Sequence, residues 1–367
     1  TAVTTGTYNT LIGGLAGDAM TTANFNVALG YNTLGANTSG GANVALGYNA
    51  LNSNTTANNN VAIGNGSIGA NTTGTFNVGV GQGSLASNTT ASNNTAVGKS
   101  ALQANTTGTE NVAIGTQSCD AGTTASYNTA LGFDTLSANV LGSRNVAIGR
   151  SALQVMNPAS AVNTYNVAVG FSAGELVTTG VENTIIDALA GDALTDADGN
   201  VALGTYALST DTLGSRAVAI GHGALLTQNF TSATNNYNVG VGHSAGRAVT
   251  TGVRNTLIGG LSGDAITTGG DNVSVGANAL TANTTAHHNT AVGSASLISN
   301  TTGANNTGLG NSALYTNTTA SSNTAVGYQS LYLNTTGASN VGVGTNALRS
   351  NTTATANAAL GYSALYT

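Results

Sequence analysis

A five-residue phrase, Asn-Val-Ala-Ile-Gly or a close variant, returns every 17 residues through almost the whole chain. Its Asn recurs at Asn9, Asn26, Asn43, Asn60, Asn77, Asn94, Asn111, Asn128 and Asn145, resumes after a four-residue insertion at Asn166, Asn183, Asn200 and Ala217, and after a second insertion runs from Asn238 to Asn357. A period this short and regular is the signature of a solenoid, in which each repeat packs only against its neighbours. We therefore predict a single all-β solenoid domain of about 21 coils over residues 1–367.

Composition restricts the possible partners of such a domain. Charged residues make up only 5% of the sequence and the net charge is −6, so nothing in the chain attracts nucleic acid electrostatically. No apolar run approaches the roughly 20 residues that span a bilayer, which argues against membrane insertion. Apolar residues reach 40% and are periodic rather than scattered, so a core can form.

Residues 94–110 illustrate one coil. Thr95, Ala96 and Val97 alternate as in a β-strand, and Gly98 permits a corner after them. A second apolar segment around Leu102 and a turn at residues 105–108 complete the repeat, and a helix is disfavoured by the recurring Gly and β-branched residues. The pattern predicts two short strands and two turns per coil, with each strand paired in parallel to its equivalent in the next coil.

Two columns of equivalent residues carry specific expectations. The first residue of the phrase should form a hydrogen-bonded ladder of side-chain amides along the stack, with Asn26, Asn43, Asn60, Asn77, Asn94 and Asn111 as examples. The third residue is small in nearly every coil, as at Ala28, Ala45, Ala62, Gly79, Ala96 and Ala113. With the flanking Val and Ile assigned to the core, this small column is predicted to face outward and to pack against sister subunits; the alternative is a tight fit inside its own coil.

Local departures from the repeat indicate specialised segments. The two insertions, near residues 155–162 and 226–234, are predicted to form longer loops. Cys119 occupies a position that holds Leu in other coils, so it is interpreted as a small buried hydrophobe. The chain starts in the middle of a repeat, because Val3-Thr4-Thr5-Gly6 matches residues 177–180, and this predicts that it is part of a longer protein.

The phrase followed by a short Ser/Ala-Leu segment, as in residues 94–108, resembles repeats of bacteriophage and bacterial tail-fibre proteins. It is also similar to the head repeats of trimeric autotransporter adhesins. The resemblance implies a left-handed β-roll that forms a homotrimer, located outside the cell on a virion or cell surface. The period of 17 differs from the shorter one of the adhesin heads, and no anchor, stalk or chaperone segment is visible.

Several short motifs mimic known functional sites. Residues 242–246 and 170–174 match the G-x-S-x-G nucleophile elbow, but they lie where each repeat strand ends and no helix can follow, so no catalytic residue is assigned. Residues 196–200 resemble part of a calcium loop without its final Glu, and His287-His288 and the pair His222 and His243 lack a third metal ligand. We expect no enzyme activity, no metal and no cofactor.

The residue after each repeat Gly varies most and should line one outer edge. Aromatic and imidazole side chains there can stack on sugars, and the candidate surface-binding edge comprises Tyr31, Tyr48, Phe133, Phe171, His222, His243, Tyr328 and Tyr362. The leading hypothesis is a structural or adhesive fibre segment whose repetitive edge binds a cell-surface glycan or receptor multivalently. The alternatives are an ice-binding solenoid that uses Thr rows such as Thr55-Thr56, and a filament that assembles end to end.

Overall fold

A computed structural model describes residues 3–366 and confirms the parallel β-solenoid, with about 21 coils of about 17 residues. The chain divides into two compact units, Thr1–Glu182 and Asn183–Thr367, which share this architecture. The described residues contain no helix with the length and hydrophobicity of a membrane span.

Unit 1 contains ten three-residue strands, one in each coil. They are β1 (Thr10–Ile12), β2 (Val27–Leu29), β3 (Val44–Leu46), β4 (Val61–Ile63), β5 (Val78–Val80), β6 (Thr95–Val97), β7 (Val112–Ile114), β8 (Thr129–Leu131), β10 (Val146–Ile148) and β12 (Val167–Val169). Within the unit, successive strands pair in parallel, and the register joins equivalent residues, such as Ala28 with Ala45. The pairing is therefore set directly by the repeat period.

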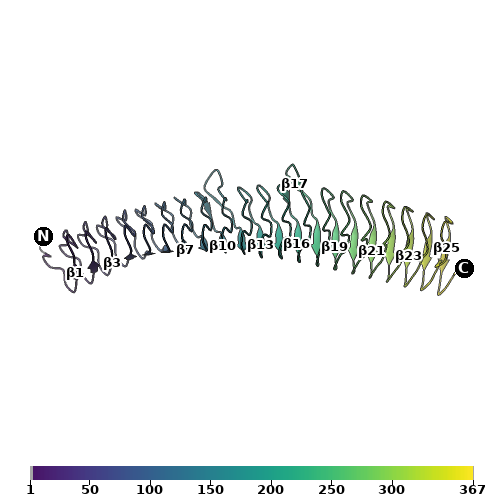
Figure 1. Ribbon diagram of the computed structural model, residues 1–367, viewed down its shortest axis with the longest axis horizontal. Helices are drawn as coiled ribbons and strands as arrows, with labels where there is room; N and C mark the ends of the chain where they lie inside the picture. The colour runs from purple at the N-terminus through teal and green to yellow at the C-terminus, as the bar shows by residue number, and fades with distance from the viewer. Residues whose placement is uncertain (1–2, 367) are drawn as a thin grey trace. The chain divides into compact units, whose positions relative to one another are not determined.

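Unit 2 contains eleven three-residue strands with the same register. They are β13 (Thr184–Ile186), β14 (Val201–Leu203), β16 (Val218–Ile220), β18 (Val239–Val241), β19 (Thr256–Ile258), β20 (Val273–Val275), β21 (Thr290–Val292), β22 (Thr307–Leu309), β23 (Thr324–Val326), β24 (Val341–Val343) and β25 (Ala358–Leu360). Figure 1 shows these strands along one side of the stacked coils, with turns making up the rest of each coil.

The second predicted strand of each coil does not form. Leu102 has φ of 52° and Ser100 has φ of 58°, so this apolar segment is a turn in the left-handed region rather than an extended strand. The same conformation recurs at Leu34, Leu51 and Leu85. It directs each Leu side chain into the coil, where it is fully buried or nearly so, and the buried packing offsets the cost of an unfavourable backbone.

The corner after each strand strongly favours glycine. Gly30 has φ of 135°, and a Cβ there would lie 2.6 Å from the carbonyl oxygen of Gly47 in the next coil. The only departure in this column among the described coils is Asp187, with φ of 98°. The coils stack at the spacing of paired strands, so the backbone of one corner lies close to the next. A Cβ at the corner would approach that neighbouring backbone, and glycine avoids this contact.

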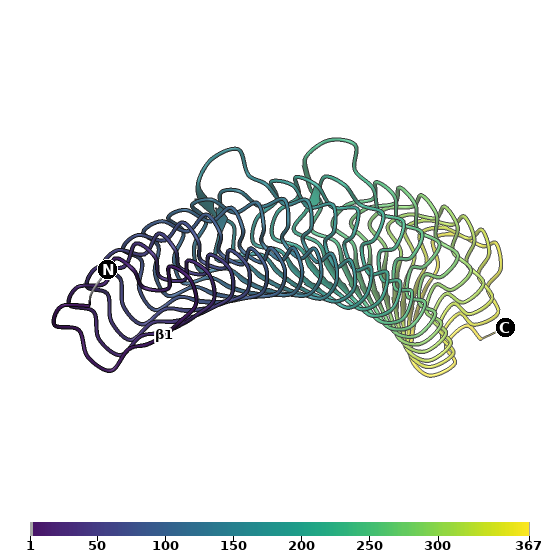
Figure 2. The same ribbon diagram turned by 60° about the vertical axis from the view of Figure 1, so that its left-hand side comes forward.

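Both insertions form loops that project away from the strands (Figures 1 and 2). The first lies above a two-stranded sheet of β9 (Gly142–Ser143) and β11 (Val162–Asn163) in unit 1. The second is based on β15 (Gly214–Ser215) and β17 (Thr234–Asn235) in unit 2. Met156 and Phe230 are buried beneath the loops, so each extra segment carries its own small apolar contact.

The small column faces inward, which corrects its prediction as an outer packing surface. Ala28, Ala45, Ala62, Gly79, Ala96 and Ala113 are all buried, whereas the residues on either side of them in each strand are partly or well exposed. The physical reason is the Leu column opposite: a Cβ at Gly79 would lie 2.7 Å from Cγ1 of Ile68, and one at Gly240 would lie 2.9 Å from Cγ of Leu225. The tight fit within the coil explains the small residues.

The Asn column forms a buried ladder along each unit, interrupted in unit 2 at Ala217. The backbone N–H of Asn43 donates to Oδ1 of Asn26 at 3.0 Å, and Nδ2 of Asn43 donates to the Ala57 carbonyl at 2.9 Å. Asn60, Asn77, Asn94 and Asn111 repeat both contacts along the stack. Each buried amide thus satisfies a backbone donor and a turn carbonyl that water cannot reach.

A second Asn column lies beside the first, and sequence analysis had assigned it only to turns. Nδ2 of Asn54 donates to Oδ1 of Asn37 at 3.2 Å and to the Ala57 carbonyl at 3.1 Å, and Asn71 and Asn88 continue the series. These Asn residues begin Asn-Thr-Thr sequences, or Asn-Thr-Ser at Asn37, that formally match glycosylation sites, but their side chains are fully buried in the folded coil.

Candidate binding surfaces

The outer side of the parallel sheet is an apolar surface, which we call the strand face. It consists of the first and third residues of the three-residue strands, and these are Val, Thr, Ile, Leu or Ala in every one of them. Val112 and Ile114 of β7 are 37% and 38% exposed, and Leu131 of β8 is 42% exposed. No charged residue interrupts the surface in the strands of either unit.

The predicted surface-binding edge is exposed in the structure. Tyr31, Tyr48, Phe133, Phe171, His222, His243, Tyr328 and Tyr362 all have exposed side chains and follow the corner glycines. Stacking places several of them together in space: the rings of Tyr31 and Tyr48 are 5.7 Å apart, and those of His222 and His243 are 5.5 Å apart and nearly parallel. Their role in binding remains a prediction.

Arginine links other members of this edge. The guanidinium of Arg150 lies between two rings, 6.0 Å from the centroid of Phe133 and 5.6 Å from that of Phe171. Such cation–π contacts contribute about 0.5–1 kcal/mol each at exposed sites, so they favour this alignment of the rings. Tyr328 and Tyr362, by contrast, are two coils apart and Thr345 occupies the edge between them, so they form no stacked pair.

Two further aromatic columns were missed by sequence analysis. One precedes the ladder Asn, where Tyr8 and Phe25 stack at 5.1 Å and Arg144 covers Tyr127 at 4.6 Å. In the other, Tyr315 and Tyr332 stack at 4.9 Å in unit 2, and Arg349 lies 5.0 Å from the ring of Tyr332. An alignment of the repeats would have placed the residues of each set in one column, because they occupy the same position in different coils.

A cavity of about 500 Å³ opens on the edge in unit 2. The rings of Tyr206, His222 and His243 line it. Tyr206 contacts His222 edge to face, with 6.0 Å between the ring centroids, and His222 stacks on His243. Its remaining lining residues are Gly223, Leu226, Ser244 and Arg247. These come from three successive coils, so only the stacked structure assembles the site.

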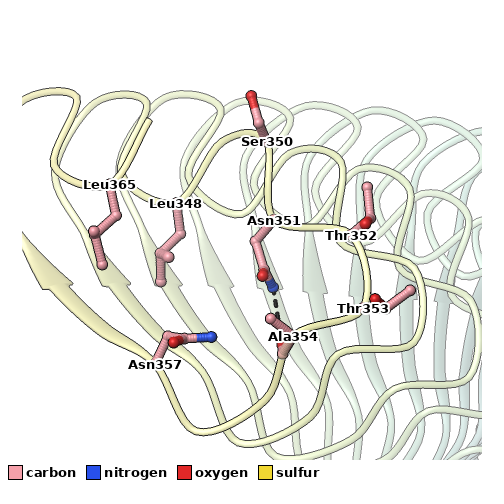
Figure 3. Close-up of a pocket in the computed structure, with 8 residues that line it drawn as sticks. All are labelled: Leu348, Ser350, Asn351, Thr352, Thr353, Ala354, Asn357 and Leu365. Atoms are coloured by element: carbon pink, nitrogen blue, oxygen red, sulfur yellow. Dashed lines mark hydrogen bonds between the residues drawn. The ribbon is translucent and has the colours of Figure 1, made fainter. Parts of the chain in front are cut away.

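Another hollow, of about 330 Å³, lies at the last described coil (Figure 3). Leu348 and Leu365 line its apolar side, and Nδ2 of Asn351 donates to the Ala354 carbonyl at 3.1 Å. The equivalent positions in earlier coils are covered by the coil that follows. The hollow is therefore the open cross-section of the repeat itself, made of the same core and ladder residues.

The motifs that mimic active sites adopt the repeat conformation. Ser172 and Ser244 are almost buried, with φ of 52° and 55°, and turns rather than helices follow them. No group of three or more His, Cys, Asp or Glu side chains in residues 3–366 is arranged to hold a metal ion. His287 instead accepts a hydrogen bond from the backbone N–H of Gly270, 2.9 Å away.

Cys119 lies in the buried Leu column, as expected from its neighbours in the repeat. It is 2% exposed and forms no disulfide. Burial, with a smaller contribution from the charge of Asp120, raises the pKa of the Cys119 thiol to about 12. The thiol is therefore neutral and packed at physiological pH, which is the condition of an unreactive structural cysteine.

No protein-family model matches the chain, and no curated protein is significantly similar to it in sequence.

Proposed function

We propose that this chain is a non-enzymatic structural segment of an extracellular fibre, such as a phage tail fibre or a cell-surface adhesin, in which copies associate through the strand face. The observation that supports this most is the continuous, uncharged surface of the strand face. Monomeric soluble proteins rarely expose an apolar patch beyond a few hundred Å², and larger ones mark interaction sites.

The size of the strand face matches a partner of its own kind. Two partly exposed side chains contribute on the order of 100 Å² of apolar surface per coil. The ten coils of unit 1 then present on the order of 1,000 Å², above the roughly 800 Å² per partner of stable interfaces. Other copies offer equally uncharged faces, so strand faces can pack together around a common axis without burying an unpaired charge.

The family resemblance favours three copies as the stoichiometry. In this assembly the aromatic edge of each copy remains available for adhesive contacts, and repetition of the edge along the fibre supports multivalent attachment to a surface. The hydrogen-bonded ladders of Asn inside each unit provide stiffness, which a projecting fibre requires.

The Thr rows give less support to ice binding. Oγ1 of Thr55 donates to the Thr72 carbonyl at 3.1 Å, and Oγ1 of Thr72 donates to the Thr89 carbonyl at 3.0 Å. The hydroxyl groups of this first Thr row are engaged within the stack, so the row is poorly placed to order a layer of water, and only the exposed second row, as at Thr56 and Thr73, faces solvent. Thermal hysteresis of the purified chain would reopen this alternative.

Light scattering coupled to size exclusion tests the proposal. One chain has a mass of 35.7 kDa, and we expect the wild type to elute as a multiple of it, with three as the favoured number. The variant Ile114→Lys/Leu131→Lys should dissociate to single chains with an unchanged circular dichroism spectrum. Thr107→Lys, in an exposed turn, is the matched control and should leave the mass unchanged. A monomeric wild type at all concentrations would contradict self-association.

A further inference from the structure

The cavity lined by Tyr206, His222, His243 and Arg247 combines features that a simple surface depression lacks. Its walls are mainly apolar ring faces, and its polar groups are the two imidazoles, the Ser244 hydroxyl and the Arg247 guanidinium. Its volume of about 500 Å³ lies within the range of small-molecule sites. Arg247 differs from the arginines that cover aromatic rings elsewhere, because no cation–π or hydrogen-bonded partner holds its guanidinium among residues 3–366.

We propose that this cavity binds a carboxylated pyranose, the acidic sugar unit of a uronic-acid or sialic-acid glycan. The inference rests on the adhesive role proposed for the aromatic edge and assigns that role to a defined site.

The ring arrangement fits the apolar face of a sugar. Tyr206 stands perpendicular to His222, at an angle of 87° with 6.0 Å between centroids, so two walls meet at a corner. His243 lies parallel to His222 within 9° and extends this wall along the next coil. A pyranose has one face of C–H groups that packs on aromatic surfaces, and its hydroxyl groups can accept or donate at the imidazole nitrogens.

The charge arrangement selects an acidic sugar over a neutral one. Arg247 can bind a carboxylate through two parallel hydrogen bonds, which adds both affinity and orientation. The acidic residue that acts on Arg247 is Asp264 in the following coil, which is outside ion-pairing distance. Burial raises the pKa of Asp264, and the charge of Arg247 lowers it. The guanidinium therefore keeps donors for an external carboxylate.

Gly223 makes room for the ligand. A Cβ at this residue would have only Oγ of Ser244 within 4 Å, at 3.8 Å, so the space above it is open. Other coils carry Asn at the same position, with nearly the same backbone: φ is 63° at Gly223, 54° at Asn49 and 56° at Asn278. The variant Gly223→Asn therefore fits the fold while its side chain fills the cavity.

Ligand-observed NMR with methyl glucuronide, a methyl sialoside and neutral methyl glucoside tests the site. We expect the wild type to bind one or both acidic sugars at least tenfold more tightly than methyl glucoside, and the preferred acid identifies the source of the carboxylate. Arg247→Gln should remove that preference, and Gly223→Asn should abolish binding. Gly83→Asn, at the equivalent open position in unit 1, is the control and should bind as the wild type does.

Three outcomes would overturn the assignment. The wild type binds acidic and neutral sugars equally, it binds none of the three sugars, or Gly223→Asn still binds the acidic sugars. The same titration on the dissociated Ile114→Lys/Leu131→Lys variant separates this inference from fibre assembly, because the cavity lies within unit 2 and needs no second copy. Binding by the dissociated variant would show that the site acts without assembly, whereas a wild type that binds acidic sugars but stays monomeric would support the site and contradict only the assembly.

Discussion

Leu257 occupies, within its own coil, the space that a side chain at Gly263 would need. A Cβ at Gly263 would lie 2.7 Å from Cδ2 of Leu257 and 2.8 Å from Cδ1 of Ile266. Regular coils show the reverse arrangement, with a small residue in the strand and a Leu in the turn, as at Ala291 and Leu297. Ile185 and Gly191 repeat the exchange. Each of these coils thus has one large and one small side chain at the two facing core positions, and only the order of the two differs.

This exchange predicts compensation between two substitutions. Leu257→Ala alone should lower the free energy of unfolding by about 2–4 kcal/mol, because it leaves a cavity. Gly263→Leu alone should lower it by about 1–3 kcal/mol through overpacking. The double variant should lose at least about 1 kcal/mol less than the sum, since the new Leu fills the space that Leu257 vacates and Leu297 has the same left-handed backbone. Urea unfolding measures all three; strict additivity would show that the two sites are independent.

The Asn ladder predicts a large effect for a single amide. Oδ1 of Asn94 accepts the backbone N–H of Asn111 at 2.9 Å, and Nδ2 of Asn94 donates to the Gly108 carbonyl at 2.9 Å. Asn94→Ala leaves the buried N–H of Asn111 without this acceptor and removes one of the two donors to the Gly108 carbonyl, the other being Nδ2 of Asn105 at 3.0 Å. It should cost about 1–3 kcal/mol in thermal or urea unfolding. Thr107→Ala, in the exposed turn of the same coil, should change stability by less than about 0.5 kcal/mol.

The Asn ladder is interrupted at one position in unit 2, and this interruption allows a second test of the buried amide acceptors. Ala217 takes the ladder position in its coil, and the backbone N–H of Asn238 donates instead to Oδ1 of Asn236 at 2.9 Å. The second insertion therefore supplies the acceptor that Ala217 lacks. Asn236→Ala should destabilise the chain about as much as Asn94→Ala does, and an effect below about 0.5 kcal/mol would show that buried water replaces the amide.

We expect replacement of Asp187 by glycine to increase the free energy of unfolding. It stands in the column of corner glycines with φ of 98°, a conformation that L-residues rarely adopt. Asp187→Gly should relieve strain that exceeds the entropic cost of glycine, for a net increase of about 1 kcal/mol in unfolding free energy. Scanning calorimetry should show a higher melting temperature; a lower one would mean that the bond from the Ala188 N–H to Oδ1 of Asp187 outweighs the strain.

Cys119 predicts a dependence of stability on alkaline pH. The pKa of its thiol is raised to about 12 in the folded chain, so the unfolded chain releases the proton first as the pH rises. The buried neutral thiol therefore contributes fully to the free energy of unfolding below the ordinary thiol pKa of about 8.5. Part of that free energy is lost as the pH rises from there towards 12. Cys119→Leu, which matches Leu102 and Leu136, should lack this loss. Thiol reagents should modify the wild type only on unfolding, and rapid labelling of the folded chain at neutral pH would contradict the buried position.

The sequence predicts the repeat period, the parallel register, the corner glycines and the Asn ladder, because each follows from equivalent residues stacking in line. It does not reveal which side of the strand faces inward. Thr95 and Val97 alternate with Ala96 in either orientation, and the choice depends on the opposing Leu column, whose left-handed backbone could not be inferred from residue type. The cavity around Arg247 was missed for a related reason, since its residues come from different positions in three coils.

The central claim is that the strand face meets another copy of the chain. The most direct measurement is cross-linking of Ile114→Cys, whose thiol replaces an exposed side chain of β7, with the native Cys119 buried and unreactive. Thr107→Cys, in an exposed turn, serves as the control. A short thiol-specific cross-linker should join chains of Ile114→Cys in pairs, as covalent dimers, because each chain has one reactive thiol, and should leave Thr107→Cys as single chains. Ile114→Cys that remains monomeric, and reacts with thiol reagents as fast as Thr107→Cys, would contradict the account.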